Sequence, residues 1–392
     1  MPEGSRSKRA EPRRALALCL AALVLACAPA ARFTVAPLPE FDAAFSRRSG
    51  WVGGDGAHTV PLADGSLLWT FGDSLVGEVR EGRREIAFFV HNAIALQRGK
   101  TPAAGALSFH FGRGPAGEPA AFFAGQGGGG WRWPFHGRQG RGGLFLFLLE
   151  VEPAAGPAAF AFSPAGGLLA VIANPADPPG DWRVDLHEIP WGAPERRFGQ
   201  AVVAEEDGTL VFGTLEENGP AGPVRHLLLA RAPAEALADF ASWRFHDGRG
   251  WSAAVEEARP LLSGIAPEFS VSRLPGADGW VLVASEEALS PRILLRFAPR
   301  PEGPWGEAIA VYSCPEAAAD ARVFCYAAKA HPALSSRPGE LIVTYVANAT
   351  DPGLLASRPE LYRPRFLRVT LDPGPARSAG PSPETARSPP GP

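Results

Sequence analysis

Five runs of mostly apolar residues recur along the chain, each introduced by a turn that contains glycine. They are "DGSLLWTFGDS" at 64–74, "GGLFLFLLEVE" at 142–152, "DGTLVFGTLEE" at 207–217, "DGWVLVASEEA" at 278–288 and "PGELIVTYVAN" at 338–348. Their turn glycines stand 78, 65, 71 and 60 residues apart. A repeat of this length, with several short strands and turn signals inside it, is typical of a β-propeller. Five copies predict five blades.

Further strand-like segments flank each of these runs. The segments that precede them are "GWVGGDGAHTVPL", "WPFHGRQ", "FGQAVVAEE", "EFSVSRL" and "AAKAHPAL". With pieces such as "IAFFVHNAIALQ" and "RFLRVTL" downstream, each blade has about four antiparallel strands, the usual number in a propeller. Helical periodicity is confined to "PAEALADFASW" at 233–243, where we predict one short helix. A β-sandwich would not explain the regular return of one turn and strand.

The two ends of the chain do not follow this pattern. Basic residues at 6–14 precede the 12-residue apolar run "ALALCLAALVLA", the layout of a secretory signal peptide. "VLAC" resembles the bacterial lipobox, which implies a signal peptide at 1–26, a lipid on Cys27 and an exported lipoprotein anchored in the cell envelope. An ordinary signal-peptidase site within "ACAPAA" is the alternative. We expect a linker at 27–36, the all-β propeller at 37–371, and a disordered Pro- and Ser-rich tail at 372–392.

The charge balance bears on the class of partner, and the cysteines bear on a disulfide. Residues 1–26 hold five basic and two acidic side chains, and without them 33 basic and 39 acidic side chains remain. This mildly acidic balance argues against a nucleic-acid partner, and we expect a monomer that meets the membrane only through its anchor. Cys314 and Cys325 close a short loop, and in an oxidising compartment they are predicted to form a disulfide. Two free buried thiols are the alternative.

A propeller brings residues that are far apart in the sequence to its axis, because the first strand of every blade lines the central channel. The residues placed there by the segments above are Asp55, His136, Gln200, Glu268, Lys329 and His331. Two carboxylates from different blades that share a pocket suit glycoside hydrolysis, in which one protonates the leaving oxygen and the other activates water. Asp73, at the end of the second strand of blade 1, is expected to reach the same pocket.

Several of these features resemble the five-bladed propeller glycosidases of the arabinanase and xylosidase group. They are the five blades, an acid in the first and fourth inner strands, "GPW" at 303–305 and a histidine in the fifth. "GGDG", "LLWTFGDS", "HNAIAL", "WRFHDGRGW" and "KAHP" look closer still to a related family of uncharacterised bacterial lipoproteins with a domain of unknown function. The resemblance implies inverting hydrolysis, with Asp55 as general base and Glu268 as general acid.

The resemblance also has departures. The glycosidases hold a second aspartate on blade 3, where this chain has Gln200, which cannot supply the negative charge that keeps an acid protonated. Their fifth-blade histidine often helps to hold a metal ion, so calcium at His331 is the only cofactor that the resemblance suggests. We otherwise expect no cofactor. Asp73, His136, Gln200, Lys329 and His331 are then the predicted substrate contacts.

Three functions remain open on this evidence. The first is a carbohydrate-binding propeller that hydrolyses glycosides, and the second is a glycan-binding or surface-scaffold propeller without catalysis. The third is a protein-interaction propeller, because a fold does not fix a function. Individual residues also have two interpretations: Asp55 could brace its glycine turn through local amides, and His331 could be a structural histidine. Tryptophans such as Trp51 and Trp133 could stack on sugars or wedge between blades.

Overall fold

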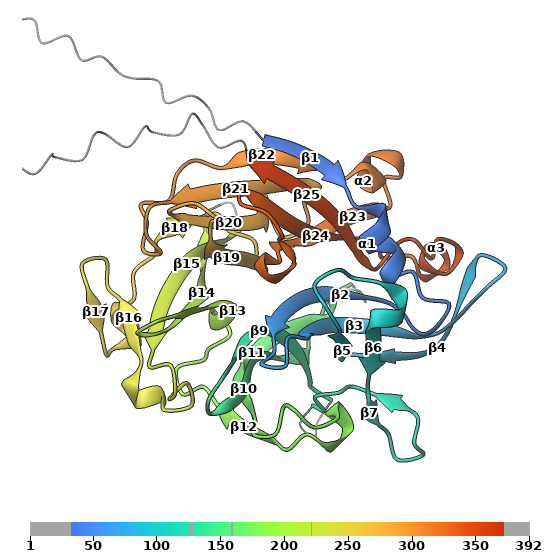
Figure 1. The fold of residues 1–392 in the computed structure, drawn as a ribbon, viewed down its shortest axis with the longest axis horizontal. Coiled ribbons are helices and arrows are strands. Elements are labelled where there is room, and N and C mark those ends of the chain that lie inside the picture. The colour runs from blue at the N-terminus through green and yellow to red at the C-terminus, as the bar shows by residue number, and fades with distance from the viewer. Residues whose placement is uncertain (1–32, 126–128, 158–159, 221, 372–392) are drawn as a thin grey trace, which may run out of the picture. The chain divides into compact units, whose positions relative to one another are not determined.

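The computed structural model describes residues 33–371, apart from 126–128, 158–159 and 221. Five antiparallel sheets stand around a common axis, so the prediction of a five-bladed β-propeller is confirmed (Figure 1). The predicted signal peptide, Cys27 and the Pro- and Ser-rich tail lie outside the described residues. In the part that is described, no helix is long and apolar enough to cross a membrane.

The first two strands of each blade coincide with the segments predicted from the repeat, except that the inner segment predicted at 327–334 in blade 5 overlaps its strand only at 327–330 and continues into a 3-10 helix, η6 (Pro332–Leu334). The inner strands are β2 (Ser49–Pro61), β9 (Trp131–Gly140), β13 (Arg196–Glu205), β19 (Phe269–Arg273) and β23 (Val323–Ala330). The second strands are β3 (Leu67–Arg80), β10 (Gly143–Pro153), β14 (Gly208–Gly219), β20 (Trp280–Ser285) and β24 (Glu340–Ala349). Neighbouring inner strands contact one another around the ring, which places their side chains at the axis.

The outer strands complete the sheets. Blade 1 has the order β2-β3-β5-β6, blade 2 β9-β10-β11-β12, blade 3 β13-β14-β15-β16-β17 and blade 4 β19-β20-β21-β22. In blades 1 and 2 these strands are β5 (Ala93–Gln97), β6 (Leu107–His110), β11 (Phe162–Ile172) and β12 (Val184–Glu188). In blades 3 and 4 they are β15 (Gly222–Ala232), β16 (Arg244–His246), β17 (Trp251–Ser252), β21 (Arg292–Ala298) and β22 (Ile309–Ser313). Outside these orders, β4 (Arg83–Val90) pairs with β3, β18 (Leu262–Ser263) pairs with β15, and β7 (Gly112–Arg113) pairs with β8 (Pro119–Ala120).

Blade 5 closes the ring with a strand from the other end of the chain. Its order is β23-β24-β25-β1, in which β1 (Phe33–Pro37) pairs with β25 (Pro364–Leu371). The stretch expected as a linker therefore enters the fold at Phe33. The pairing ties the first strand to the last blade, and β1 is the outermost strand of blade 5.

Helices are few and short. The α-helices are α1 (Pro39–Ala44), α2 (Pro315–Ala319) and α3 (Pro352–Ser357). The helix predicted at 233–243 is wrong: the segment forms turns and one 3-10 helix, η4 (Phe240–Ser242). The reason is tertiary packing, because Leu237 is fully buried and the indole Nε1 of Trp243 donates to its carbonyl at 3.0 Å.

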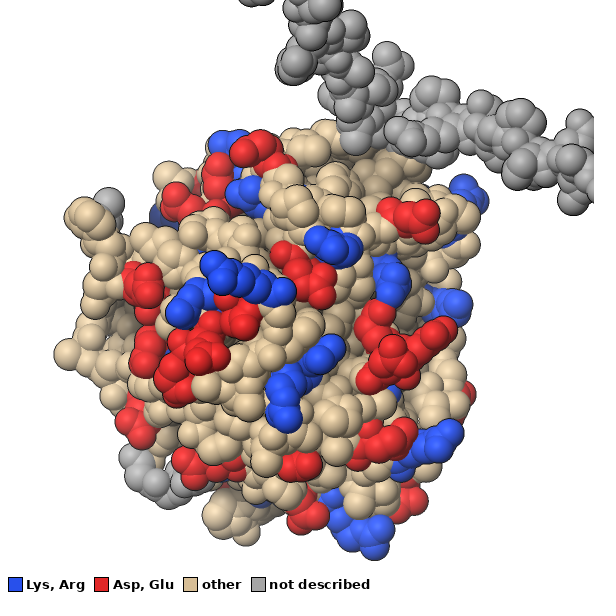
Figure 2. All heavy atoms as spheres, turned by 90° about the vertical axis from the view of Figure 1, so that its left-hand side faces the viewer, with Lys and Arg blue, Asp and Glu red and all other residues tan. Residues whose placement is uncertain are grey.

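Apolar side chains fill the spaces between blades. Trp51, Trp69 and Trp243 are among the largest fully buried side chains, so Trp51 wedges into the core, where its ring stacks on Phe109 at 4.6 Å. Cys314 and Cys325 form the predicted disulfide, and both are buried. On the face turned to the viewer in Figure 2, basic and acidic side chains are interspersed and form no continuous basic surface.

Candidate active site at the axial mouth

Register shifts interrupt four of the five inner strands near the axis. They occur in β2 between Gly54 and His58, and in β9, β13 and β23. A β-bulge bends its strand and re-aims a side chain, and bulges are frequent beside active sites. Only β19 pairs without a shift, and Glu268 stands directly before it. These local distortions turn polar side chains of different blades toward the axis.

The glycines around Asp55 are required by close approaches. A Cβ on Gly53 would lie 2.7 Å from the carbonyl oxygen of Tyr362, and one on Gly54 would lie 2.7 Å from Ser74 Oγ. A Cβ on Gly72, in the paired strand β3, would lie 2.5 Å from Asp55 Oδ1. The bare segment "GGDG" thus lets the last blade pack onto the first and lets the Asp55 carboxylate lie over strand β3.

Two tyrosines hold the Asp55 carboxylate. The Tyr326 hydroxyl donates to Asp55 Oδ2 at 2.6 Å, and it accepts a hydrogen bond from Asn348 Nδ2 at 3.0 Å. The Tyr362 hydroxyl donates to the carbonyl of Asp73 at 3.0 Å and lies 3.3 Å from Asp55 Oδ2. The hydrogen bonds to this carboxylate thus come from blade 5, and within the described residues none comes from an amide of its own turn.

The electrostatic surroundings of Asp55 favour its neutral form. Burial raises the pKa of Asp55 well above its usual value, and the negative charges of Asp73 and Glu268 raise it further. The hydrogen bond from Tyr326 and the positive charge of Lys329 lower it in part. Asp55 therefore lies within electrostatic reach of an acid on its own blade and of an acid from blade 4.

Asp73, on strand β3, is a neighbour of Asp55 at the same end of the channel. We call this end, where Asp55, Asp73 and Glu268 gather, the axial mouth. Its Oδ1 accepts a hydrogen bond from the indole Nε1 of Trp133 at 2.8 Å and lies 3.0 Å from His91 Nδ1. The side chain is 22% exposed. Trp133 comes from β9 of blade 2, so the Asp73 carboxylate lies where blades 1 and 2 meet. The Tyr362 hydroxyl bonds to both Asp55 and the carbonyl of Asp73, so the two residues are neighbours, and the role of Asp73 as a substrate contact stays a prediction.

Glu268 is paired with a buried ammonium group. Lys329 Nζ donates to Glu268 Oε2 at 2.8 Å, to the carbonyl of Ala327 at 3.0 Å and to the carbonyl of Gly56. The Lys329 side chain is 1% exposed, whereas that of Glu268 is 22% exposed. His58 Nε2 lies 3.9 Å from the same carboxylate oxygen. One lysine therefore links blade 5 with the backbone of blade 1 and with the acid of blade 4.

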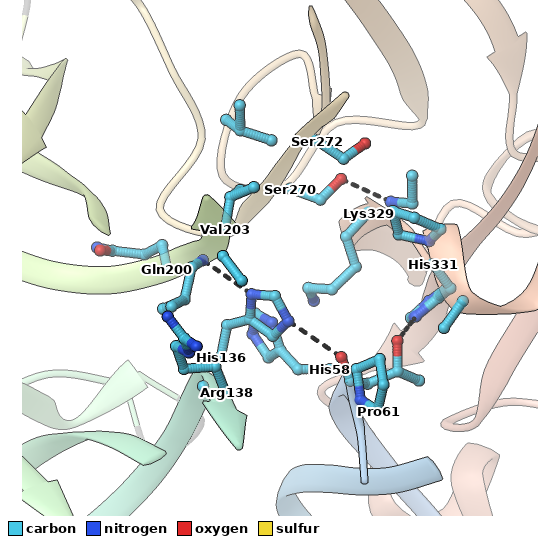
Figure 3. A pocket seen from close by; sticks show the side chains of 18 of the residues that line it. His58, Pro61, His136, Arg138, Gln200, Val203, Ser270, Ser272, Lys329 and His331 are labelled. Atoms are coloured by element: carbon cyan, nitrogen blue, oxygen red, sulfur yellow. Dashed lines mark hydrogen bonds between the residues drawn. The ribbon is translucent and has the colours of Figure 1, made fainter. Parts of the chain in front are cut away.

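A cavity of about 380 Å³ follows the mouth along the channel (Figure 3). Its lining includes His58 of β2, His136 of β9, Gln200 of β13 and Lys329 of β23, together with His331, which follows β23 directly. The predicted site residues thus divide into two groups. Asp55, Asp73 and Glu268 lie at the mouth, His136, Gln200 and His331 line the cavity, and Lys329 reaches both.

Two cavity histidines are fully engaged with the protein. His136 Nδ1 accepts from the Val202 amide at 2.9 Å, and its Nε2 donates to the carbonyl of Thr59 at 3.0 Å. His331 lies between two hydroxyls, 3.0 Å from Thr59 Oγ1 and 2.7 Å from Thr344 Oγ1. Burial lowers the pKa of His136 to about 4 and that of His331 well below its usual value. Both are placed as neutral structural histidines, and their roles as substrate contacts stay predictions.

Gln200 and His58 present unused polar atoms to the cavity. Gln200 Nε2 donates to Thr214 Oγ1 at 3.1 Å, while its Oε1 and His58 Nε2 have no hydrogen-bond partner among the described residues. Gln200 therefore lies on the axis, as its strand predicts, but it is an amide in the cavity and adds no charge to the mouth. No described group of three Cys, His or acidic side chains lies close enough for a metal except Cys314, Glu316 and Cys325, where the cysteines are joined.

Aromatic side chains form a rim beside Asp73. This aromatic rim comprises Phe89, His91, Trp131, Trp133 and Phe162. The His91 ring stacks on Trp131 at 4.4 Å, and Phe89, whose exposed fraction is 53%, lies 5.3 Å from His91. Trp133 contacts Trp131 at 6.0 Å and Phe162 at 4.7 Å. Partly exposed rings that adjoin carboxylates are suited to contact both the apolar face and the hydroxyls of a sugar.

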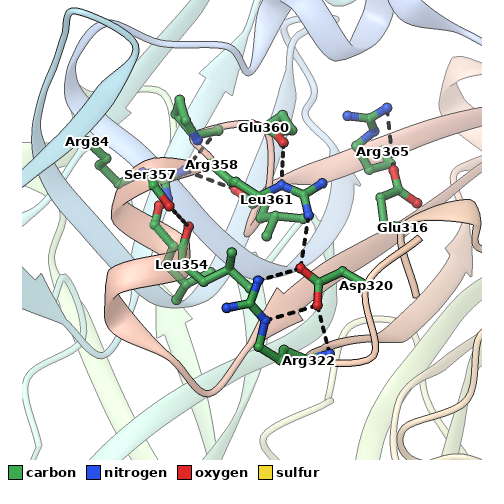
Figure 4. Close-up of polar contacts among 12 residues, drawn as sticks. Arg84, Glu316, Asp320, Arg322, Leu354, Ser357, Arg358, Glu360, Leu361 and Arg365 are labelled. Carbon is green, nitrogen blue, oxygen red and sulfur yellow. Dashed lines mark hydrogen bonds and ion pairs between the residues drawn. The ribbon is translucent and has the colours of Figure 1, made fainter. Parts of the chain in front are cut away.

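A polar network holds the loop that carries Tyr362. Arg84 donates to four carbonyl oxygens, those of Val52, Leu355, Pro359 and Leu361, at 2.6–3.0 Å. Close by, Arg358 pairs with Glu360 at 2.8 Å, and Asp320 accepts from Arg322 (Figure 4). The Arg84 contacts fasten the segment after α3 to blade 1, which fixes the Tyr362 hydroxyl over Asp55 and Asp73.

Sequence reasoning missed Tyr326, Tyr362 and His91. Tyrosine is rare in this chain, with four in total, and Tyr326 lies in the fifth inner strand, so its rarity and position were a usable signal. Tyr362 adopts a left-handed backbone with φ of 54° in a loop, which the sequence does not reveal. Asn92, which stands in the apolar segment "FFVHNAIAL", satisfies buried backbone groups, since its Nδ2 donates to the carbonyls of Phe123 and Arg132.

The fold and the site define a five-bladed β-propeller with three carboxylates at its axial mouth. Residues 39–371 match the family described as Domain of unknown function (DUF5005), and the chain belongs to this family. No curated protein matches it significantly.

Among solved structures, a Bacteroides ovatus protein provisionally described as a hydrolase superimposes with a TM-score of 0.70 at 19% identity, over 86% of this chain and 90% of that chain. A GH43_1 enzyme from Xanthomonas citri complexed with xylotriose gives a TM-score of 0.41 at 14% identity, over 86% of this chain and 90% of the enzyme. The first similarity shows a shared fold, and the second is too low to carry an argument about activity.

Proposed function

We propose that the axial mouth binds carbohydrate and hydrolyses a glycosidic bond with inversion. The observation that carries this proposal is the meeting of Asp55 from blade 1 with Glu268 from blade 4, since Lys329 Nζ bonds both to Glu268 Oε2 and to the carbonyl oxygen of Gly56, the residue after Asp55. Inverting hydrolysis needs two carboxyl groups on opposite sides of the bond, about 6.5–9.5 Å apart, with room for a water. Both side chains are in part accessible to solvent.

A third carboxylate supports the catalytic form of the proposal. The related glycosidases carry a second aspartate on blade 3, and Gln200 stands there in this chain. Asp73 lies beside Asp55 instead and supplies a negative charge from blade 1. A charge of this sign keeps a neighbouring carboxyl protonated toward neutral pH, as a proton donor requires.

The aromatic rim supports carbohydrate as the ligand. Its rings are partly exposed, and the indole of Trp133 is tied to Asp73, so a sugar that stacks on the rim lies next to the carboxylates. The rim lies at the junction of blades 1 and 2, so it offers a second contact to a chain of sugars whose reacting bond is at Asp55.

We also propose that the protein is exported through residues 1–26 and anchored by a lipid on Cys27 in the cell envelope, where polymeric glycans occur. The Cys314–Cys325 disulfide supports an oxidising compartment. Partition of full-length chain and of a Cys27→Ser variant between detergent and water tests the anchor. Wild type is expected in the detergent phase and the variant in water; the same partition for both contradicts the anchor.

One observation favours a second function, glycan binding without catalysis. Lys329 neutralises Glu268 within the site, so a chain that had lost hydrolysis could keep this pair as a structural element and use the mouth for binding alone.

The test measures sugar release by the full-length chain from arabinan, xylan, galactan and aryl glycosides. Wild type is expected to release sugar, and Asp55→Asn and Glu268→Gln are each expected to lower the rate by about 10²–10⁴, the usual contribution of a general acid or base. The exposed Asp185 and Glu206 provide the matched controls Asp185→Asn and Glu206→Gln, which should keep full activity. A glycan that raises the melting temperature without release supports the second function. If wild type neither releases sugar nor binds a glycan, the carbohydrate proposal is overturned.

A further inference from the structure

We propose that the two carboxyl groups have exchanged roles relative to the related glycosidases, so that Asp55 is the proton donor and Glu268 the carboxylate that deprotonates water. We further propose that Asp73 is a positioning residue that keeps the proton on Asp55. This inference rests on the proposed function, since it assigns the steps of the same hydrolysis.

The first argument is the ion pair at Glu268. A general acid must hold a proton at the start of each cycle, but Glu268 Oε2 receives a hydrogen bond from the Lys329 ammonium at 2.8 Å. The other two acceptors of Lys329 are neutral carbonyl oxygens, of Gly56 and Ala327. A protonated Glu268 would leave a lysine that is 1% exposed without a counter-charge, which is strongly unfavourable.

The second argument is the setting of Asp55. Asp73 shares the Tyr362 hydroxyl with Asp55, and among the described residues its carboxylate is bonded by no basic side chain other than the His91 ring, while Lys329 is committed to Glu268 and to carbonyl oxygens. Two ionised aspartates side by side repel each other, and one shared proton removes this cost. Tyr326 donates to Asp55 Oδ2, while no hydrogen bond within the described part reaches Oδ1. The proton therefore belongs on Oδ1, which lies over Gly72.

The titratable and charged groups that face the pair come from every element packed against it. Around Asp55 they are Asp73 on β3, Glu268 before β19, Tyr326 and Lys329 on β23, and Tyr362 before β25. Around Glu268 they are Lys329 and Tyr326 on β23 and, on β2, His58 and Asp55. In the described part of the chain, the only lysine or arginine bonded to either carboxylate is Lys329, and it is bonded to Glu268.

In the hydrolytic step, Asp55 gives its Oδ1 proton to the glycosidic oxygen. The bond from that oxygen to the anomeric carbon breaks, with both electrons going to the oxygen. A water oxygen forms the new bond to the anomeric carbon from the opposite face, and Glu268 takes one proton from that water. The products are a free alcohol and a sugar of inverted configuration. Solvent then removes the proton from Glu268 and returns one to Asp55.

Asp73 is fixed by two donors from outside its own strand. Trp133 Nε1 and the His91 ring both reach its Oδ1, at 2.8 and 3.0 Å, so the charge is held in one place beside Asp55. Asp73→Asn removes the charge and keeps the shape. We expect it to move the basic limb of the kcat against pH profile to lower pH, because Asp55 then loses its proton more readily. A purely structural role would lower kcat without moving that limb.

The experiment that separates the roles compares leaving groups. A proton donor is dispensable when the leaving group departs as a stable anion, whereas the base is needed for every substrate. Wild type, Asp55→Asn and Glu268→Gln are assayed on the responsive polysaccharide and on the 2,4-dinitrophenyl glycoside of the same sugar. Melting temperatures check that each variant is folded, and Asp55→Ala is a second variant for the donor.

We expect Asp55→Asn and Asp55→Ala to lose about 10³-fold on the polysaccharide and to stay near wild type on the dinitrophenyl glycoside. Glu268→Gln should lose activity on both the polysaccharide and the dinitrophenyl glycoside. Added azide should restore the activity of Glu268→Ala, with formation of a glycosyl azide of inverted configuration. The opposite pattern, with the dinitrophenyl activity kept by Glu268→Gln and azide rescue at Asp55→Ala, overturns the exchange but leaves hydrolysis intact. Absence of hydrolysis by wild type on every substrate overturns the proposed function and the exchange together.

Discussion

Replacement of Lys329 by methionine tests whether one buried ammonium organises the mouth. Lys329→Met keeps much of the side-chain volume but removes the donor to Glu268 Oε2 and to the carbonyl oxygens of Gly56 and Ala327. Breaking a buried ion pair by removal of one partner costs roughly 3–5 kcal/mol. Because Glu268 is 22% exposed and can be solvated in part, we expect the lower end, about 3 kcal/mol.

Urea unfolding at pH 7 measures this cost for Lys329→Met, Glu268→Gln and the double variant. A hydrogen bond to a charged group contributes about 1.5–3 kcal/mol, so the double-mutant cycle should give a coupling free energy of about 2 kcal/mol. The exposed Lys100 supplies the control Lys100→Met, which should leave the free energy of unfolding unchanged within about 0.5 kcal/mol.

Two results would refute the reasoning. One is a Lys329→Met protein as stable as Lys100→Met. The other is additivity of the two single variants within about 0.5 kcal/mol, the value expected for side chains that do not interact. Either result means that Lys329 does not hold Glu268 in its charged form, and the exchange of roles then loses its first argument.

Three further predictions concern the packing and the pH dependence of the propeller. Gly72→Ala should abolish hydrolysis, because the new Cβ would lie 2.5 Å from Asp55 Oδ1; sugar release on the responsive substrate measures this. Stability should fall as the pH is lowered from about 6.5 to about 4, since unfolded histidine binds a proton in this range and His136, with a pKa of about 4, does not. His136→Asn should make this fall shallower in urea titrations at several pH values. The double variant Cys314→Ser with Cys325→Ser should lose about 3 kcal/mol in urea unfolding, since the disulfide closes a loop with a sequence separation of 11 residues.

Each of these predictions has a control or a contradicting result. Gly105→Ala places its Cβ in open space and should keep activity, so equal losses at the two glycines would contradict the steric argument. A slope unchanged by His136→Asn would mean that this histidine is not neutral when folded. Equal stability of the reduced and oxidised wild type would contradict the stabilising role of the disulfide.

The architecture of the blades could be predicted because its signal is local. Each blade repeats a turn glycine followed by an apolar second strand, and these features lie within about ten residues of each other. Strand β1 was not predicted, because its pairing is not local: Phe33 pairs with Leu371 at the other end of the propeller sequence. The helix expected at 233–243 failed for a similar reason, since burial of Leu237 and Trp243 overrides the local pattern.

The site was predictable only as far as the blades place it. The inner strands bring Asp55 and Glu268 to the axis, but the partners of these acids depend on contacts across the ring. Tyr326 lies 271 residues from Asp55, and Tyr362 lies 307 residues away. Lys329 was expected as a substrate contact, which stays a prediction, and its bonds to Glu268 and to two carbonyl oxygens were not foreseen. The strand repeat places Lys329 on the inner strand of blade 5, but it does not reveal that the Lys329 ammonium pairs with the Glu268 carboxylate.

The most direct test of carbohydrate recognition at the mouth is a crystal structure of the Glu268→Gln variant soaked with a mixture of arabino-, xylo- and galacto-oligosaccharides. We predict one sugar with its glycosidic oxygen within hydrogen-bond reach of Asp55, and a neighbouring sugar against the ring of Trp133. Sugar found only in the cavity beyond Lys329, or no sugar in the axial channel at all, would contradict the account.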